Sequence, residues 1–157
     1  MSEFTQGIFT SLIPALMVSI ITAFLTVKLS IRQFYSQRWW EKKAEAYSHI
    51  IEQLSNLQYF FGEFYDEYTH TKTLGDKNKE ILSEGYHQAR EAIVKVASIG
   101  SYIVSDETAT ALEKLLLELE KRDPKEDLVG SIANNYESVK GCIIKIREYS
   151  KADLLKK

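Results

Sequence analysis

The start of the chain and its remainder follow different hydrophobic patterns. From Phe4 to Val27, twenty-four consecutive residues carry no charge and are rich in Ile, Leu, Val, Phe, Ala and Met. As a helix this run would extend roughly 36 Å, more than the bilayer hydrocarbon core of about 30 Å. A core helix of a soluble protein usually shows a polar stripe or stops sooner. The pattern therefore predicts a transmembrane helix over residues 4–27.

The charges on either side of this run predict whether it is cleaved and how it is oriented in the membrane. A cleaved signal peptide carries basic residues in front of its apolar run, whereas this chain has Glu3 there. We therefore interpret the run as a retained signal anchor, followed by a basic juxtamembrane helix over residues 28–43. The positive-inside rule then places everything after the span in the cytoplasm. The basic residues behind the run are Lys28, Arg32, Arg38, Lys42 and Lys43.

Beyond residue 43 the apolar positions recur with the spacing of amphipathic helices. One seam repeats every seven residues, and a second set falls three residues after its middle members, which is typical of a packed helix. This helix can be continuous with the span. The seam consists of Trp40, Tyr47, Leu54, Phe61 and Tyr68, and the second set of Ile50, Leu57 and Phe64.

Three further helices are predicted. A break at residues 73–76 precedes a helix that ends near Gly100, and Ser105 is a candidate N-cap for the next helix, which closes before Pro124. The last helix is expected from about Lys125 to Ala152. The fold class is thus all-α: one N-terminal transmembrane helix that continues into a cytosolic antiparallel four-helix bundle over residues 44–157. The apolar stripes are Ile81, Leu82, Tyr86, Ala89, Ile93 and Val96, then Leu112, Leu115, Leu116 and Leu119, then Leu128, Ile132, Tyr136, Val139, Ile143 and Ile146.

Composition narrows the function classes. The formal net charge of -2 gives no basic excess for duplex nucleic acid, and the single cysteine, Cys142, excludes an intrachain disulfide scaffold and fits a reducing compartment. With only two prolines and seven glycines in 157 residues, an all-β fold lacks its turns. The function classes that remain are ligand binding and an action at the membrane, each carried out by one helical domain.

A stripe of small residues in the span is a candidate face for self-association. Ser11, Ala15, Ser19 and Ala23 recur every four residues, and such stripes let helix backbones approach closely. Because Ser, Ala and Thr are common in any span, an ordinary lipid-facing helix remains the alternative.

The search for enzyme chemistry is mostly negative. No phosphate-binding loop, dinucleotide fingerprint, nucleophile elbow or zinc-protease motif occurs. Glu84 and His87 form one E-x-x-H, but a di-iron bundle needs a second such motif and two further carboxylates. Cys142 lies among apolar residues and lacks an activating base, which favours an inert buried thiol. We expect neither catalysis, nor a metal, nor a cofactor.

Two helices carry polar groups that could bind a ligand. His87 and Arg90 lie on the second helix, and Asn134, Asn135 and Tyr136 interrupt the apolar pattern of the last helix. Arginine offers a fork for phosphate, asparagine can pair with an adenine edge, and tyrosine offers a stacking face. An anionic or nucleobase ligand would require the two helices to converge. An ordinary exposed helix surface is the alternative.

The stretch Phe34-Tyr35-Ser36-Gln37-Arg38-Trp39-Trp40-Glu41-Lys42-Lys43, which runs on to Glu52, resembles small bacterial single-span proteins found around antiphage systems. In architecture the whole chain resembles the cyclic-tetra-adenylate-gated membrane effectors of type III CRISPR immunity. This resemblance implies a bacterial inner-membrane protein that assembles as a homo-oligomer, with a tetramer expected. It also implies that cyclic tetra-adenylate binds the cytosolic domain and rearranges the spans, which opens a pore or disrupts the bilayer.

Two other functions stay open. In a membrane-tethered scaffold, the bundle docks a protein partner and the span only fixes its location. An aromatic run along the first helix suits that role equally well, because it covers more than one face of the helix. A toxin or holin-like protein would act without any ligand. The aromatic run consists of Tyr59, Phe60, Phe61, Phe64, Tyr65 and Tyr68.

Overall fold

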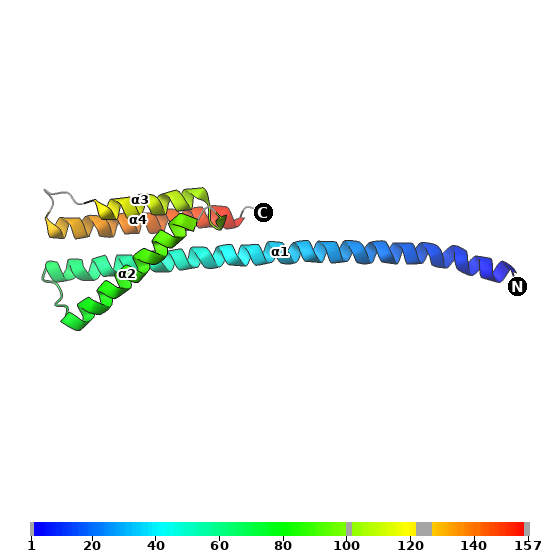
Figure 1. Cartoon of the computed structure of the whole chain (residues 1–157), viewed down its shortest axis with the longest axis horizontal. Helices are drawn as coiled ribbons and strands as arrows, with labels where there is room; N and C mark the ends of the chain where they lie inside the picture. Colours follow the sequence, from blue (N-terminus) through cyan, green and yellow to red (C-terminus); the bar gives the residue numbers. More distant parts are fainter. Residues whose placement is uncertain (1, 100–101, 122–126, 156–157) are drawn as a thin grey trace. The chain divides into compact units, whose positions relative to one another are not determined.

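The computed structural model describes residues 2–99, 102–121 and 127–155, with side chains from Leu16 onwards. Within these ranges the chain forms four helices and no strand: α1 (Ser2–Tyr68), α2 (Asp76–Ile99), α3 (Asp106–Glu120) and α4 (Leu128–Leu155) (Figure 1). The all-α prediction is confirmed. The predicted continuity of the apolar run with the first amphipathic helix is also confirmed, because α1 contains both.

The chain divides into two compact units. The first, Met1–Glu41, is the N-terminal segment and consists of the first part of α1; the second, Lys42–Lys157, is the helical domain. The basic juxtamembrane helix predicted over residues 28–43 therefore spans the division. Within the helical domain α3 and α4 lie side by side, and α2 runs obliquely to them (Figure 1).

The core of the helical domain is built on the predicted seam of α1. Tyr47, Ile50, Leu54, Leu57 and Phe61 are all 5% exposed or less. The seam is shorter than predicted, because Trp40 and Tyr68 at its two ends are exposed. The other helices complete the core with Ala89, Ile93 and Ala97 of α2, Leu112 and Leu115 of α3, and Ile132, Val139, Cys142, Ile143 and Ile146 of α4.

Two residues predicted to face inward are exposed instead. Ile81 of α2 and Leu128 of α4 are 58% and 56% exposed. Each lies near the start of its helix, before the first buried residue, which is Ala89 in α2 and Ile132 in α4. Leu128 lies on the same side of α4 as Ile132, Val139 and Ile146, whereas Ile81 lies at least about 80° around α2 from Ala89, Ile93 and Ala97. Periodicity does not tell where along a helix the neighbouring helices begin to cover the inward stripe.

Local signals fix the helix ends. Ser105 caps α3 as predicted: its backbone is extended, and its hydroxyl accepts a hydrogen bond from the Thr108 amide at 3.3 Å. Asp127 caps α4 in the same way, since its carboxylate accepts from the Gly130 amide at 2.8 Å. The predicted start of this helix at Lys125 lies outside the described residues, and its end at Leu155 is three residues beyond the prediction.

Two ion pairs stabilise the turn after α1. His70 adopts a φ of 60°, the left-handed conformation that commonly ends helices. Lys72 then pairs with Glu63 and Lys79 with Glu67, each at 2.6 Å. The hydrogen bond to its glutamate raises the pKa of each lysine, so both stay charged at neutral pH. The connection from α1 to α2 is thereby held at two points.

Candidate functional site

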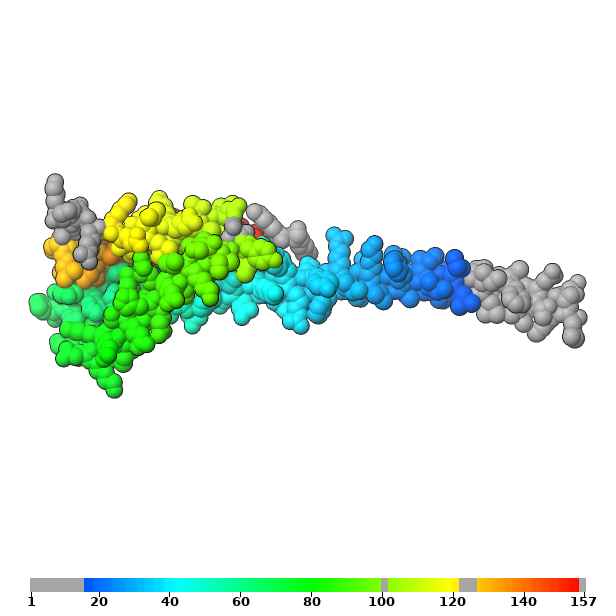
Figure 2. Space-filling model, viewed as in Figure 1, coloured from blue at the N-terminus to red at the C-terminus, as the bar shows by residue number. Residues whose placement is uncertain are grey.

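The N-terminal segment exposes large apolar side chains over most of its circumference. Consecutive residues of a helix point about 100° apart, so the exposed run Leu16, Met17 and Val18 alone covers most of the circumference. Phe24 is 66% exposed, and further bulky residues follow as far as Phe34 (Figure 2). Among the described helices α1 is the one long and apolar enough to cross a membrane, by length and composition. A helix that exposes large apolar side chains over most of its circumference requires an apolar environment on most of its sides.

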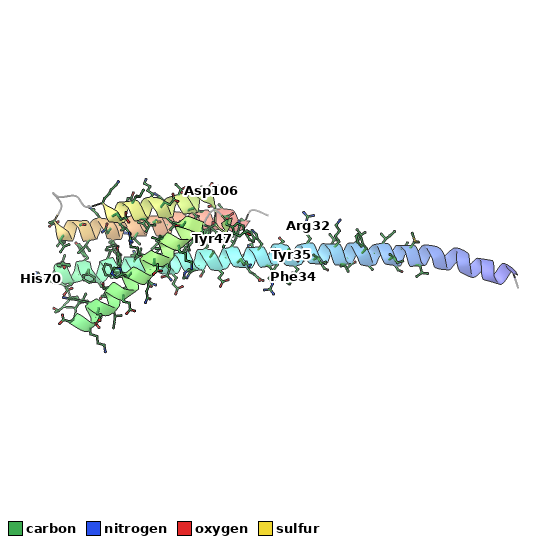
Figure 3. All side chains as sticks on the ribbon, viewed as in Figure 1. Arg32, Phe34, Tyr35, Tyr47, His70 and Asp106 are labelled. Atoms are coloured by element: carbon green, nitrogen blue, oxygen red, sulfur yellow. The ribbon has the colours of Figure 1, made fainter. Side chains whose placement is uncertain are left out.

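Exposed aromatic and basic side chains follow this apolar stretch. Phe34, Tyr35 and Trp39 alternate with Arg32 and Arg38 in the last three turns of the N-terminal segment. The Arg38 guanidinium carbon lies 5.2 Å from the centroid of the Phe34 ring, a cation–π geometry. Figure 3 shows Arg32 and Phe34 on opposite sides of α1. Such a mixture of rings and cations is typical of the boundary between acyl chains and headgroups.

A polar network joins three helices at the beginning of the helical domain. Asp153 of α4 accepts an ion pair from Lys43 at 2.8 Å and a hydrogen bond from the Tyr47 hydroxyl at 2.9 Å. The Tyr47 oxygen in turn accepts from the Ser105 amide at 3.1 Å, at the N-cap of α3. Thr108, which is fully buried, lies at 3.5 Å from the same oxygen. Because Tyr47 itself is buried, this network ties α1 to the start of α3 and the end of α4.

A pocket of about 500 Å³ opens between α1, α2 and the loop that follows α2. Its floor is apolar, and four polar side chains, His49, Gln88, Glu91 and Lys95, stand among its lining residues. This size and this mixture are usual for sites that bind small molecules. The remaining lining residues are Ala46, Ala92, Val96, Ile99, Ile103 and Val104.

The predicted ligand residues lie in two places. His87 and Arg90 are in the same two turns of α2 as the pocket residues Gln88 and Glu91, although neither lines the pocket. Arg90 forms an ion pair with Glu120 of α3. This pair connects α2 to α3 and already engages the guanidinium that was predicted to bind an anion.

The predicted residues of α4 do not line this pocket either. Tyr136 packs against α1, with its ring 3.5 Å from the position that a Cβ at Gly62 would occupy, and Lys140 lies over the ring at 6.0 Å. Asn134 is exposed and Asn135 is half-buried. The described contacts thus connect Tyr136 with Gly62 of α1 rather than with His87 and Arg90 of α2.

The small residues predicted for self-association are only partly described. Ser19 and Ala23 lie on the exposed surface of the N-terminal segment. The side chains of Ser11 and Ala15 lie outside the described ones. Thr26 donates its hydroxyl hydrogen bond to the Thr22 carbonyl at 2.8 Å, so this hydroxyl is satisfied inside its own helix.

The residues considered for catalysis or metal binding lie in surroundings that suit a structural role. Cys142 is buried, as predicted, and burial raises the pKa of its thiol to about 11, so it stays protonated at neutral pH. Glu84 accepts a hydrogen bond from Gln88 at 3.3 Å. Among the described side chains, no three His, Cys, Asp or Glu residues gather into a group that could hold a metal ion.

The aromatic run of α1 is largely used within the helical domain. Phe60 stacks against Tyr86 of α2 with ring centroids 4.5 Å apart, and Phe61 and Phe64 pack beside it. Tyr59, Tyr65 and Tyr68 remain exposed. Phe60, Phe61 and Phe64 therefore pack within their own domain, whereas Tyr59, Tyr65 and Tyr68 keep an exposed surface.

Sequence reasoning missed the pocket and the Asp153 network. His49 and Lys95 lie far apart in the chain and belong to no motif, so nothing in the sequence marked them as neighbours. Asp153 did carry a signal, because it is one acid in the otherwise basic or apolar end of α4 from Lys151 to Leu155. Comparisons with protein families, with curated proteins and with solved structures found no match for this chain.

Proposed function

We propose that this protein is a membrane-anchored antiviral effector. The N-terminal segment spans the bacterial inner membrane once, and the helical domain, arranged as an antiparallel four-helix bundle, faces the cytoplasm. Several copies assemble through their spans. A cyclic oligoadenylate, with cyclic tetra-adenylate as the expected messenger, binds the helical domains and rearranges the spans, so that the membrane leaks.

The observation that carries this proposal is that α1 belongs to both the N-terminal segment and the helical domain. One uninterrupted helix carries both the exposed apolar stretch that needs a bilayer and the buried seam around which the helical domain packs. A ligand that binds one packing arrangement of the domain better than another acts on this helix. A few kcal/mol of differential affinity shifts such an equilibrium from one state to the other.

The pocket beside α1 supports the position of the ligand. An adenine ring suits an apolar floor with an amide such as Gln88 at its edge, and Lys95, His49 and the nearby His87 offer positive charge or hydrogen-bond donors to phosphate. One pocket holds only part of a cyclic tetranucleotide. Several copies would therefore contribute one such pocket each, which agrees with the expected oligomer.

Fractionation followed by a vesicle assay tests the proposal. Full-length protein should sediment with membranes, and in dye-loaded vesicles it should release dye only after cyclic tetra-adenylate is added. The variant with His49→Ala and Lys95→Ala, two residues that line the pocket, should insert normally and lose this response. Recovery of intact protein from the soluble fraction would reject the anchor. An inserted protein that releases no dye with the messenger would reject the gating.

A membrane-tethered scaffold is the second candidate. The exposed tyrosines of α1, together with Ile99 and Tyr102 beside the pocket, which are 53% and 74% exposed, favour the docking of a protein partner. A scaffold predicts that the protein inserts but never causes leakage. It also predicts that Tyr59→Ser or Tyr102→Ser impairs function, whereas the His49 and Lys95 variant does not.

A further inference from the structure

The N-terminal segment has two chemically distinct faces. At 3.6 residues per turn, an arc of roughly 100° contains only Ser, Thr, Ala and Gln side chains over the five turns from Ser19 to Gln37. Neither a charge nor a large apolar side chain falls on this arc within that range. We call it the amide–hydroxyl stripe; its members are Ser19, Thr22, Ala23, Thr26, Ser30, Gln33 and Gln37.

The opposite side of the same helix carries the cations. Lys28, Arg32 and Arg38 fall within an arc of roughly 120° that also contains Tyr35 and Trp39. All these side chains are exposed. The charge of the segment is thus concentrated on one side, which we call the cationic face.

This separation decides which side can meet a second copy and which side can meet lipid. Cations brought to the axis between two identical helices would repel each other and would lose hydration. On the outside, the same cations and their neighbouring rings meet the anionic headgroups of the cytoplasmic leaflet, which attract basic side chains. The amide–hydroxyl stripe carries no such penalty, because Ser, Thr and Gln side chains form hydrogen bonds across helices in membranes.

The hydrogen bonds inside α1 agree with this assignment. Gln37 donates to the Glu41 carboxylate at 3.0 Å, which positions the acid at the C-terminal end of the stripe rather than on the cationic face. Thr26 donates its hydroxyl hydrogen bond to the Thr22 carbonyl, so this hydroxyl does not oppose close packing in an apolar environment. Gln33 and Ser30 lie between these two bonds on the same side of the helix.

We propose that a second copy of this chain packs, α1 against α1, on the amide–hydroxyl stripe, with the cationic face turned outward to lipid headgroups. The inference rests on the proposed membrane function and deepens it. It extends the self-association face beyond Ser19 and Ala23 to Gln37. In a ring of several copies, the same stripe lines the axis and provides an uncharged polar path along it.

Disulfide crosslinking of full-length protein in native membranes tests the packing face. Ser30→Cys, Gln33→Cys and Gln37→Cys should shift to twice the monomer mass when oxidised with copper phenanthroline. Ile31→Cys and Tyr35→Cys, at the same depth on the cationic face, are the matched controls and should stay monomeric. The wild-type chain should also stay monomeric, because Cys142 is buried and its thiol is protonated at neutral pH.

A charge placed on each face provides a second readout. In the Ser30→Cys background, Gln33→Arg should abolish the crosslinked band, whereas Tyr35→Arg should leave it unchanged. Equal crosslinking on both faces, a stronger band on the cationic face, or no band from inserted protein would overturn the proposal. Because no messenger is added, a chain that crosslinks as expected but never releases dye would contradict only the gating function.

Discussion

The first and second parts of α1 are the same helix in two different environments. In the N-terminal segment, Ile20, Phe24 and their apolar neighbours are more than half exposed, whereas Tyr47, Leu54 and Leu57 in the helical domain are at most 2% exposed. Both parts are rich in large apolar residues. The second finds its apolar environment within its own chain, and the first must receive it from outside. This contrast identifies the bilayer and a second copy as the partners to test.

The largest effect is expected from charges placed in the exposed apolar stretch. Ile20→Arg combined with Phe24→Arg should cost about 2.5–3.5 kcal/mol per arginine for insertion, because each side chain would lie among acyl chains. The protein should therefore move from the membrane pellet to the soluble or aggregated fraction in a sedimentation assay. This change tests whether the stretch is embedded in lipid.

The control for this experiment places the same charges on the helical domain. Leu117 and Ile144 are 62% and 53% exposed, and the double variant Leu117→Arg with Ile144→Arg should remain in the membrane pellet. If the Ile20 and Phe24 variant stayed as firmly membrane-bound as this control, the N-terminal segment would not be the anchor.

Shortening one leucine in each part of α1 tests the same difference between the two environments through stability. Leu54→Ala should destabilise the helical domain by about 2–5 kcal/mol, because a fully buried side chain leaves a cavity. Leu25→Ala removes the same atoms from an exposed position and should leave the unfolding of the helical domain unchanged. Urea denaturation in detergent, followed by circular dichroism, measures both. Equal effects of the two substitutions would contradict the division into two environments.

The Asp153 network is the next target. Asp153→Asn removes the charge that faces the partly buried Lys43 and weakens the acceptor for Tyr47, which should cost about 1–3 kcal/mol. Glu137→Gln, whose partner Lys140 is exposed, is the matched control and should cost under about 1 kcal/mol. The same urea titration compares them. A smaller loss for Asp153→Asn than for the control would show that the network does not hold α1 to α4.

The sequence predicted the features that depend on neighbours along the chain. The uncharged run, the heptad seam through Tyr47 and Leu54, and the Ser105 cap each arise from residues within a few turns of one another, and all three agree with the structure. The network was beyond this reasoning because it joins Lys43 to Asp153, 110 residues apart. Periodicity shows which side of a helix is buried but not the direction in which two helices cross.

The pocket and the surroundings of Tyr136 illustrate that limit. The pocket exists because α2 passes α1 beside Ala46 and His49. No pattern in either helix indicates where the two helices cross. Tyr136 is a candidate because of its ring and its polar neighbours, yet its ring packs beside Gly62 of another helix, a contact that no pattern in α4 indicates. Candidate ligand residues chosen from the sequence were therefore chemically reasonable individually, while their grouping required the three-dimensional arrangement.

The smallest effect concerns two glycines inside helices of the helical domain. A Cβ at Gly85 of α2 or Gly141 of α4 would meet no atom within 4 Å, so alanine fits at both positions. Because glycine is about 0.8–1.0 kcal/mol less favourable than alanine inside a helix, Gly85→Ala and Gly141→Ala should each raise the stability of the helical domain by up to that amount. Gly75, whose carbonyl accepts the first hydrogen bonds of α2, is the control: Gly75→Ala gains no helix propensity at this N-cap position and should not raise the urea midpoint. Destabilisation by either helical substitution would mean that these faces are covered in the assembled protein, and that a partner or a second copy reaches the helical domain as well as the N-terminal segment.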